Sequence, residues 1–265
     1  MISEDQSLSD EIRGETGYDD LSRALERQEI EVLFQPQFSC ASDEVIGAEA
    51  LARWHHPVRG KIGGQELFEI AEQHGLVLPL SSHIILSALN TAASWPGHLD
   101  LSLNMTPQEL CDPGYAANFL KIAMACGVEL RNILVEVTEQ TLLNQLDIAM
   151  GELRLLKAAG VRVALDDFGA GFCNFNYLKR LPLDHIKLDR SMVEGIGESE
   201  RDLAIFRAIV ALARALELKI TAEGIEDEAQ RKAVAEEGCD YWQGFLRAQP
   251  MTSAEMLDIA SAANS

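Results

Sequence analysis

The sequence lacks the features that mark secreted, zinc-binding or membrane-spanning proteins. It has no Cys-x-x-Cys pair, only five scattered cysteines: Cys40, Cys111, Cys126, Cys173 and Cys239. This pattern excludes a disulfide framework and a zinc ribbon. No apolar run approaches the ~18 residues of a membrane span, and the acidic N-terminus has no signal-peptide pattern. We therefore expect a cytoplasmic protein, or the cytoplasmic domain of a larger one, without direct membrane insertion.

Basic residues are scarce. Lys and Arg number 22 against 42 Asp and Glu, which gives a formal net charge of −20. This charge repels nucleic acid and anionic membranes at long range, so we expect no nucleic-acid partner. An anionic substrate would need metal ions or local basic residues to hold it. Apolar residues make up 47% of the chain, enough for a sizeable core.

What the chain does contain is an alternation of short apolar segments with longer amphipathic stretches. The strand-like segments are Val32–Phe38, Val45–Leu51, Leu99–Asn104, Ile133–Val137, Val161–Leu165, His185–Leu188, Lys219–Ala222 and Tyr241–Phe245. Such alternation predicts a parallel sheet, either open and doubly wound or closed. The segment count is close to eight, and no Gly-rich nucleotide fingerprint follows the first strand, so closure is favoured.

The first two segments are joined by the short Ser39–Glu44 loop, which has no room for a helix. They can therefore pair as a hairpin, which would make the first strand antiparallel. We predict the α/β class and a modified (β/α)8 TIM-type barrel with an irregular first strand. The predicted organisation is an acidic linker or frayed N-terminus over residues 1–20, a barrel over 21–258 and a C-terminal tail over 259–265.

Polar residues stand near the C-terminal ends of these predicted strands. The series is Glu49, Asn104, Glu136, Asp166 with Asp167, Lys187 with Asp189, Glu223 and Gln243. In a parallel barrel these ends converge on one rim, the face that carries the active sites of barrel enzymes. Contact with solvent explains one such residue, but it does not explain the whole series.

The residue types in this series favour a hard metal ion. Carboxylates with a carboxamide suit Mg²⁺, Mn²⁺ or Ca²⁺. Asp166 and Asp167 precede a flexible Gly-containing turn, where both can face the mouth and bridge two metals. Lys187 could lower the pKa of a bound water or hold developing negative charge. Its simpler interpretation is a salt bridge to Asp189 or another neighbour.

At this point the motifs resemble those of a known family. The matching stretches, in order, are Phe34-Gln35-Pro36, Gly47–Trp54 with His56-Pro57, Leu101–Asn104, Leu134–Glu139, Leu165–Gly169, Ile186–Ser191, Ala222–Glu226 and Gln243–Phe245. Their shared order and register resemble the EAL domain, the cyclic di-GMP-specific phosphodiesterase module, from about residue 21 to residue 251. The resemblance implies a modified barrel that hydrolyses cyclic di-GMP to linear pGpG in bacterial signalling.

The resemblance also implies roles for individual positions. It implies two divalent ions, Mg²⁺ or Mn²⁺, with Ca²⁺ inhibitory, and the metal ligands Glu49, Asn104, Glu136, Asp166, Asp167 and Glu223. The implied catalytic residues are Lys187, Glu223 and Glu49. Substrate contacts would come from Gln35, Arg53, Asp189, Glu226 and Gln243, and Glu139 would brace the loop after Asp167. A homodimer is implied, with an upstream sensor or diguanylate cyclase domain in a parent protein.

The loop after Asp167 departs from the common form of the family. Residues 168–175 read Phe-Gly-Ala-Gly-Phe-Cys-Asn-Phe, where Thr at 170, Tyr at 172 and Ser at 173 and 174 are commoner. Gly64 stands where many members have Pro. No metal ligand is lost, but the loop bears on turnover rate and on coupling to the dimer interface. Two alternatives therefore stay open: a cyclic di-GMP receptor with little or no activity, and a regulatory dimerisation module.

Other conspicuous residues have simpler interpretations. His55 and His56 are adjacent and no His-Asp dyad follows, which argues against a histidine-aspartate type of phosphodiesterase. His185 could share a face with Lys187, but a core or solvent role is favoured. The three tryptophans are expected to pack in the core, with Trp242 the one candidate for the rim because Gln243 follows it.

Overall fold

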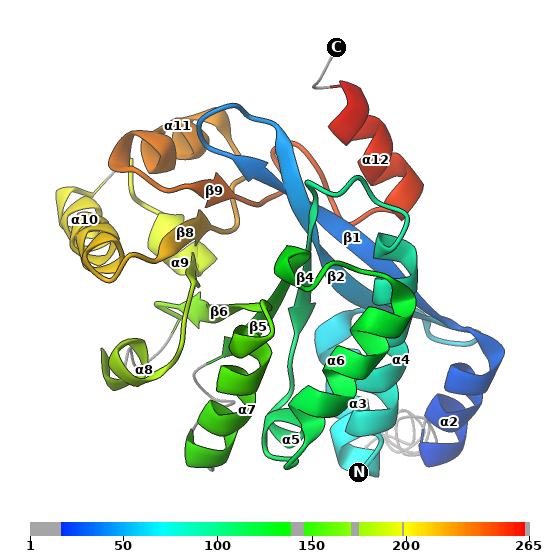
Figure 1. Cartoon of the computed structure of the whole chain (residues 1–265). Coiled ribbons are helices and arrows are strands. Elements are labelled where there is room, and N and C mark those ends of the chain that lie inside the picture. The colour runs from blue at the N-terminus through cyan, green and yellow to red at the C-terminus, as the bar shows by residue number, and fades with distance from the viewer. Residues whose placement is uncertain (1–16, 139–145, 171–174, 198, 263–265) are drawn as a thin grey trace, which may run out of the picture.

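The structure is a computed structural model that describes residues 17–138, 146–170, 175–197 and 199–262. Its centre is a closed eight-stranded barrel (Figure 1). Around the barrel the strands are β1 (Ile30–Ser39), β2 (Val45–His56), β4 (Asp100–Asn104), β5 (Ile133–Thr138), β6 (Arg162–Phe168), β7 (His185–Leu188), β8 (Lys219–Ala222) and β9 (Tyr241–Trp242). A ninth strand, β3 (Gly60–Ile62), pairs with β2 alone.

The first strand runs against the others. β1 is antiparallel to β2 from Ile30↔Trp54 to Phe38↔Val45, and it is antiparallel to β9 through Phe38↔Trp242. The remaining barrel pairs, from β2–β4 to β8–β9, are parallel. The expected barrel with an antiparallel first strand is therefore confirmed. The hairpin follows from the connection, because a parallel crossover needs a dozen or more residues.

Helices cover the outside of the barrel (Figure 1). They are α2 (Tyr18–Arg27), α3 (Gly64–His74), α4 (Val77–Ala92), α5 (Pro107–Leu110), α6 (Tyr115–Cys126), α7 (Leu146–Ala158), α8 (Phe175–Arg180), α9 (Arg190–Val193), α10 (Glu200–Ala215), α11 (Glu228–Glu237) and α12 (Ser253–Ala262), with the 3₁₀ turn η1 (Leu130–Asn132) before β5. Among these described helices, none is both long and apolar enough to cross a membrane.

The apolar core lies between the barrel and its helices. Alternate strand residues such as Leu103, Val135 and Ile220 are buried in one large cluster with the inner faces of α4, α6, α7 and α10. A second cluster joins α2, α3 and the end of β2 around Trp54. Because successive strand residues face opposite sides, the residues between these apolar positions point into the barrel. The polar strand residues therefore face the barrel interior, together with a few apolar ones such as Leu134 and Ala164.

The observed elements extend past several predicted limits. β2 continues to His56, which places Glu49 inside the strand and not near its end. Helix α2 begins at Tyr18 and α12 reaches Ala262, so helical structure passes the boundaries expected at residues 21 and 258. β9 is shorter than predicted, because the chain leaves the strand after Trp242.

Gly47 provides a test of how β2 joins the parallel part of the barrel. It pairs with Asp100 of β4, and a Cβ at this position would lie 2.4 Å from the Asp100 carbonyl oxygen. Backbone cannot move aside without opening the β2–β4 pair, so we predict that Gly47→Ala lowers the free energy of unfolding by roughly 1–3 kcal/mol. Urea denaturation followed by circular dichroism measures this change.

The matched control is Gly97→Ala, because Gly97 has no left-handed φ and a Cβ there would meet nothing within 4 Å. Its unfolding midpoint should stay close to that of the unchanged chain. Equal midpoints for the two variants would contradict the close approach at Gly47.

Candidate active site

Polar side chains from seven strands meet at the mouth of the barrel, where the parallel strands end. They come from the middle of β2, from the ends of β4 to β8 and from the residue after β9. Most are buried, with exposed fractions of 1% for Glu136 and Lys187, 5% for Gln243 and 7% for Glu49 and Asp166. The polar residues at the predicted strand ends therefore form one cluster at the barrel mouth, and most of this cluster is buried.

The Lys187 ammonium lies at the centre of this cluster. Its Nζ is 2.6 Å from Glu136 Oε2, 2.8 Å from Glu223 Oε1, 3.1 Å from Asp166 Oδ1 and 3.5 Å from Glu49 Oε2. These four carboxylates raise the pKa of Lys187 well above its usual value, against the opposing effect of burial. Lys187 is thus a fixed internal cation that faces four carboxylates, and it does not pair with Asp189.

Glu49 is held by donors on both of its carboxylate oxygens. Asn104 donates from Nδ2 to Oε1 at 2.7 Å, and Gln243 donates from Nε2 to Oε2 at 2.8 Å. Burial alone would raise the pKa of Glu49, but Lys187 and these hydrogen bonds outweigh it and lower the pKa. Glu49 is therefore the carboxylate of the cluster that is best stabilised in its charged form.

The other carboxyl groups have raised pKa values. Burial, followed by repulsion from neighbouring carboxylates, outweighs Lys187 and raises the pKa of Glu136 and of Asp166. The same causes raise the pKa of Glu223 to about 8 and that of Asp167 to about 6. A single ammonium is thus too little positive charge for all of these groups to ionise together at neutral pH.

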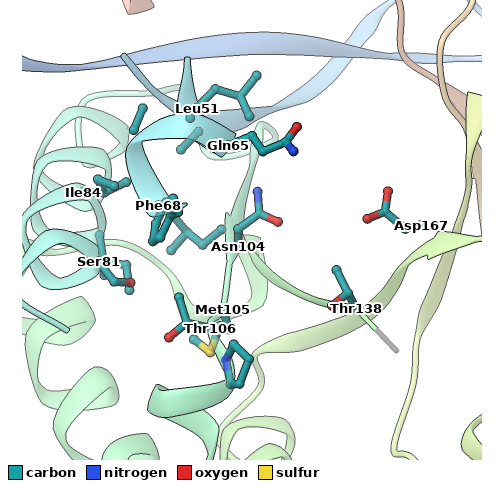
Figure 2. A pocket seen from close by; sticks show the side chains of 16 residues that line it. Leu51, Gln65, Phe68, Ser81, Ile84, Asn104, Met105, Thr106, Thr138 and Asp167 are labelled. Atoms are coloured by element: carbon teal, nitrogen blue, oxygen red, sulfur yellow. The ribbon is translucent and has the colours of Figure 1, made fainter. Parts of the chain in front are cut away.

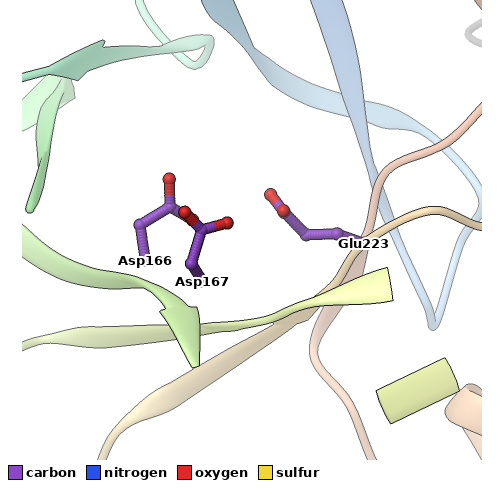
Figure 3. Close-up of side chains that lie close together, drawn as sticks. All are labelled: Asp166, Asp167 and Glu223. Atoms are coloured by element: carbon purple, nitrogen blue, oxygen red, sulfur yellow. The ribbon is translucent and has the colours of Figure 1, made fainter. Parts of the chain in front are cut away.

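A β-bulge brings Asp166 and Asp167 to the same side of β6. Leu165 pairs with Ile186 and Phe168 pairs with Leu188, so β6 has one residue more than β7 between these pairs. Asp167 takes a left-handed backbone conformation, with φ of 54°. Adjacent residues of a regular strand face opposite sides, but here both carboxylates lie on the side that faces Glu223, the residue after β8 (Figure 3).

The donor set of this mouth fits a hard divalent cation. Asp166, Asp167 and Glu223 each offer an oxygen within 4.8 Å of the others. Glu136 Oε1 is buried without a hydrogen-bond partner among the described residues, and the amide oxygen of Asn104 is not the atom that bonds Glu49. Oxygen donors with an excess of negative charge are the ligands that Mg²⁺, Mn²⁺ and Ca²⁺ prefer.

A pocket of about 630 Å³ opens beside the carboxylates. Leu51, Phe68 and Ile84 form an apolar wall, and Asp167 lies across the opening from Gln65 and Asn104 (Figure 2). An apolar wall with a few polar groups at its rim is the usual make-up of a small-molecule site. The candidate metal ligands Asn104 and Asp167 line this pocket, so the polar cluster and the pocket are continuous.

The remaining predicted contacts lie at or near the rim. Gln35 is buried and pairs across the hairpin with Glu49, while the Arg53 guanidinium donates to the Ala52 carbonyl at 2.7 Å.

Asp189 accepts from the backbone nitrogen of Ser191 as the N-cap of α9. Glu226 is exposed and pairs with Arg190 at 2.8 Å. Glu139 lies outside the described residues, as do residues 171–174 of the variant loop.

Two other candidates are core residues, as the simpler interpretation predicted. Trp242 is fully buried and stacks on Phe38 with ring centroids 4.6 Å apart, so it is not at the rim. His185 shares the inward face with Lys187 but lies buried deeper in the barrel, stacked on Tyr241. Gln37 was not among the predicted site residues, but it is 3% exposed and donates to Gln243 at 2.9 Å. Its position two residues after Gln35 places it on the same strand face, and this spacing in the sequence could have indicated that Gln37 faces the barrel interior.

The comparisons with known proteins agree with this geometry. The sequence model of the EAL domain family matches residues 18–250, and the chain belongs to this family. The bifunctional diguanylate cyclase/cyclic di-GMP phosphodiesterase MucR of Pseudomonas aeruginosa is 35% identical over 242 residues, which cover 90% of this chain and 35% of MucR. A signaling protein of Caulobacter vibrioides is 37% identical over 231 residues, which cover 87% of this chain and 29% of that protein.

A solved structure of the PaMucR phosphodiesterase in complex with c-di-GMP matches with a TM-score of 0.84 at 33% identity. The match covers 90% of this chain and 98% of that chain. This chain therefore spans about a third of the length of the curated relatives named above, while it spans nearly the whole of the solved phosphodiesterase domain.

The raised pKa of Glu223 gives a testable pH dependence. A carboxyl group whose pKa rises on folding stabilises the fold below its unfolded pKa, and this stability is lost as pH rises through the folded pKa. For Glu223 these limits are 4.5 and about 8. We predict that in EDTA the melting temperature falls as the pH rises across this range, and that Glu223→Gln makes the fall shallower because an amide cannot ionise.

Thermal unfolding of both proteins at a series of pH values measures the difference. Glu129→Gln is the control, because Glu129 is exposed and lies before β5 at the opposite end of the barrel. Its slope should match that of the unchanged chain. If the melting temperature of Glu223→Gln fell with pH as steeply as that of the unchanged chain, the raised pKa of Glu223 would be refuted.

Proposed function

We propose that this chain hydrolyses cyclic di-GMP to linear pGpG in a reaction that depends on two divalent ions, Mg²⁺ or Mn²⁺. The observation that carries the proposal is the complete set of carboxylates gathered around Lys187 at the barrel mouth. Membership of the EAL family and the likeness to PaMucR, a phosphodiesterase solved with c-di-GMP, support the choice of substrate. The intact site favours an enzyme over a receptor that binds without cleaving.

In this proposal the carboxylates and the Asn104 carboxamide oxygen bind the ions. Bound ions would supply an activated water and neutralise the scissile phosphodiester. Lys187 holds developing negative charge from inside the barrel, where its low exposure strengthens the interaction. Glu223, 2.8 Å from the Lys187 ammonium and beside the Asp166–Asp167 pair, is placed to help bind an ion or to accept a proton from the attacking water.

The substrate contacts follow from the position of the pocket. Arg53, on the same strand as Glu49, offers a forked guanidinium to a phosphate. The apolar wall with Leu51 and Phe68 receives a purine base. At the rim, the Gln65 nitrogen donates to Glu69 at 3.0 Å, so its carboxamide oxygen is the atom that would accept a hydrogen bond from the base. Gln35, Asp189, Glu226 and Gln243 are assigned to the remaining substrate contacts.

The proposal places this chain within a larger signalling protein. The curated relatives are about three times as long, and MucR carries a diguanylate cyclase activity in its name. An upstream sensor or cyclase domain would therefore control the barrel, which would act as a homodimer in the cytoplasm. Glu139 would brace the loop after Asp167 and connect the metal site with that regulation.

Glu49→Gln tests the catalytic assignment with little change in shape. It removes the charge that two amide donors and Lys187 hold in place, so turnover of cyclic di-GMP in Mn²⁺ should fall about 1000-fold, as expected for losing several kcal/mol of metal-dependent stabilisation. Chromatography of the pGpG product measures the rate. The control is again Glu129→Gln, whose rate should be that of the unchanged chain. A fully active Glu49→Gln variant would show that the site is misassigned.

Replacing Mg²⁺ or Mn²⁺ with Ca²⁺ separates binding from hydrolysis. Ca²⁺ accepts the same oxygen ligands but at longer and more variable distances, so it should permit substrate binding and suppress turnover. Calorimetry with cyclic di-GMP in Ca²⁺, beside product chromatography in Mn²⁺, measures both properties. Tight binding with no product in any of the three metals would contradict the enzyme and leave the receptor.

A further inference from the structure

A row of hydrogen-bonded, buried polar side chains runs through the barrel and ends at the Glu49 carboxylate. Ser102 Oγ donates to Gln37 Oε1 at 3.4 Å, Gln37 Nε2 donates to Gln243 Oε1 at 2.9 Å, and Gln243 Nε2 donates to Glu49 Oε2 at 2.8 Å. Ser102, Gln37 and Gln243 have exposed fractions of 0%, 3% and 5%. Four strands supply the row: β4, β1, the end of β9 and β2.

The Glu49 carboxylate, which can only accept hydrogen bonds, fixes the direction of this row. Glu49 accepts on both oxygens, so the Gln243 carboxamide must turn its nitrogen toward Glu49. The Gln243 oxygen then faces Gln37, which must present its own nitrogen. If the Gln243 amide turned over, oxygen would face the Glu49 carboxylate and nitrogen would face the Gln37 nitrogen. Both contacts would be repulsive in a buried site, where unpaired polar groups are costly.

We infer that Gln37 is a positioning residue for the metal site: it locks the orientation of the Gln243 carboxamide and thereby the placement of the Glu49 carboxylate. This inference rests on the proposed role of Glu49 as a metal ligand. Among the described residues, the Gln37 side chain hydrogen-bonds to Gln243 and Ser102 and to none of the carboxylates, and Gln37 does not line the pocket.

The backbone around Gln243 is already fixed, so its side chain is the part that needs an anchor. Its nitrogen donates to the Ala222 carbonyl at 2.9 Å and its carbonyl accepts from Ile225 at 3.1 Å. Gly244 lies so close to Ile225 that a Cβ there would be 2.1 Å from the Ile225 carbonyl oxygen. The backbone leaves two orientations open to the Gln243 amide, and the hydrogen bonds to Glu49 and from Gln37 together exclude one of them.

Two substitutions of Gln37 separate positioning from simple packing. Gln37→Met keeps an unbranched side chain of similar length but cannot donate to Gln243. Gln37→Glu keeps the shape and, when ionised, can only accept, so it draws the Gln243 nitrogen away from Glu49. Removing the outer partner of a metal ligand typically weakens metal affinity 10–100-fold. We expect Mn²⁺ binding to weaken about 10-fold in Gln37→Met and further in Gln37→Glu at pH 8.

The Mn²⁺ affinities of the two Gln37 variants should also differ in how they depend on pH. A protonated carboxyl group at position 37 could again donate to Gln243 and accept from Ser102, as the amide does. The deficit of Gln37→Glu relative to the unchanged chain should therefore shrink as the pH falls, whereas the deficit of Gln37→Met should stay constant. A purely structural role predicts no such difference between the two variants.

The experiment is calorimetric titration of each protein with Mn²⁺, without substrate, beside a melting temperature in EDTA. Ser102→Ala is the matched control, because its 3.4 Å bond lies at the far end of the row, and it should cost less than about 3-fold in affinity.

Affinities within 2-fold of the unchanged chain in both Gln37 variants, whatever their melting temperatures, would overturn the inference. Tighter binding by Gln37→Glu would overturn it as well, and so would a loss in Ser102→Ala as large as that in Gln37→Met. Failure of the unchanged chain itself to bind Mn²⁺ would instead overturn the proposed function, and the positioning role with it.

Discussion

Charge balance at the barrel mouth is the constraint on which the site depends. Lys187 is one positive charge among four carboxylates, of which Glu49, Glu136 and Asp166 are buried, with Asp167 close by. Two like charges about 4 Å apart repel by roughly 4 kcal/mol at an effective dielectric constant of 20. The raised pKa values of Glu136, Asp166 and Glu223 are the response of the metal-free site to this repulsion. Divalent cations would relieve it, which is why the cluster points to a metal centre and not to a set of structural salt bridges.

Two irregular features of the fold bring these carboxylates close together. The antiparallel β1–β2 hairpin lets β2 run past the mouth to His56, so Glu49 projects into the barrel from the middle of a strand. The bulge in β6 turns Asp166 and Asp167 to the same side, at the cost of a left-handed backbone at Asp167. Such a conformation is unfavourable for a residue other than glycine, and it persists where the surrounding structure fixes it. Neither feature belongs to a regular (β/α)8 barrel.

Much of this arrangement could be predicted from the sequence because strand ends in a parallel barrel share one face. That rule placed Glu136, Lys187 and Glu223 together, and the short Ser39–Glu44 loop predicted the hairpin. The rule does not describe Glu49, whose strand is longer than its apolar pattern suggests. It also could not give the bulge at Asp166–Asp167, because the extra residue is defined by its pairing with β7, a contact between distant parts of the chain.

Gln37 shows a second limit of sequence reasoning. A polar residue beside Phe38 on a buried strand carries no sign of its partners, which lie on β4 and after β9. Its role depends on hydrogen-bond direction, and that direction is set by Glu49 two side chains away. Helix α2 begins before residue 21 and α12 ends after residue 258, the limits expected for the barrel, for a related reason. Helices α2 and α12 are held by packing on the barrel, which local composition does not express.

The central claim is that the carboxylates around Lys187 form a divalent-metal site. Anomalous diffraction at the manganese absorption edge, from crystals of the chain grown with Mn²⁺, tests it most directly. The account predicts anomalous peaks at the barrel mouth within bonding distance of carboxylate oxygens of Asp166, Asp167 and Glu223. A mouth without a peak at saturating Mn²⁺, with Lys187 still joined to all four carboxylates, would contradict it.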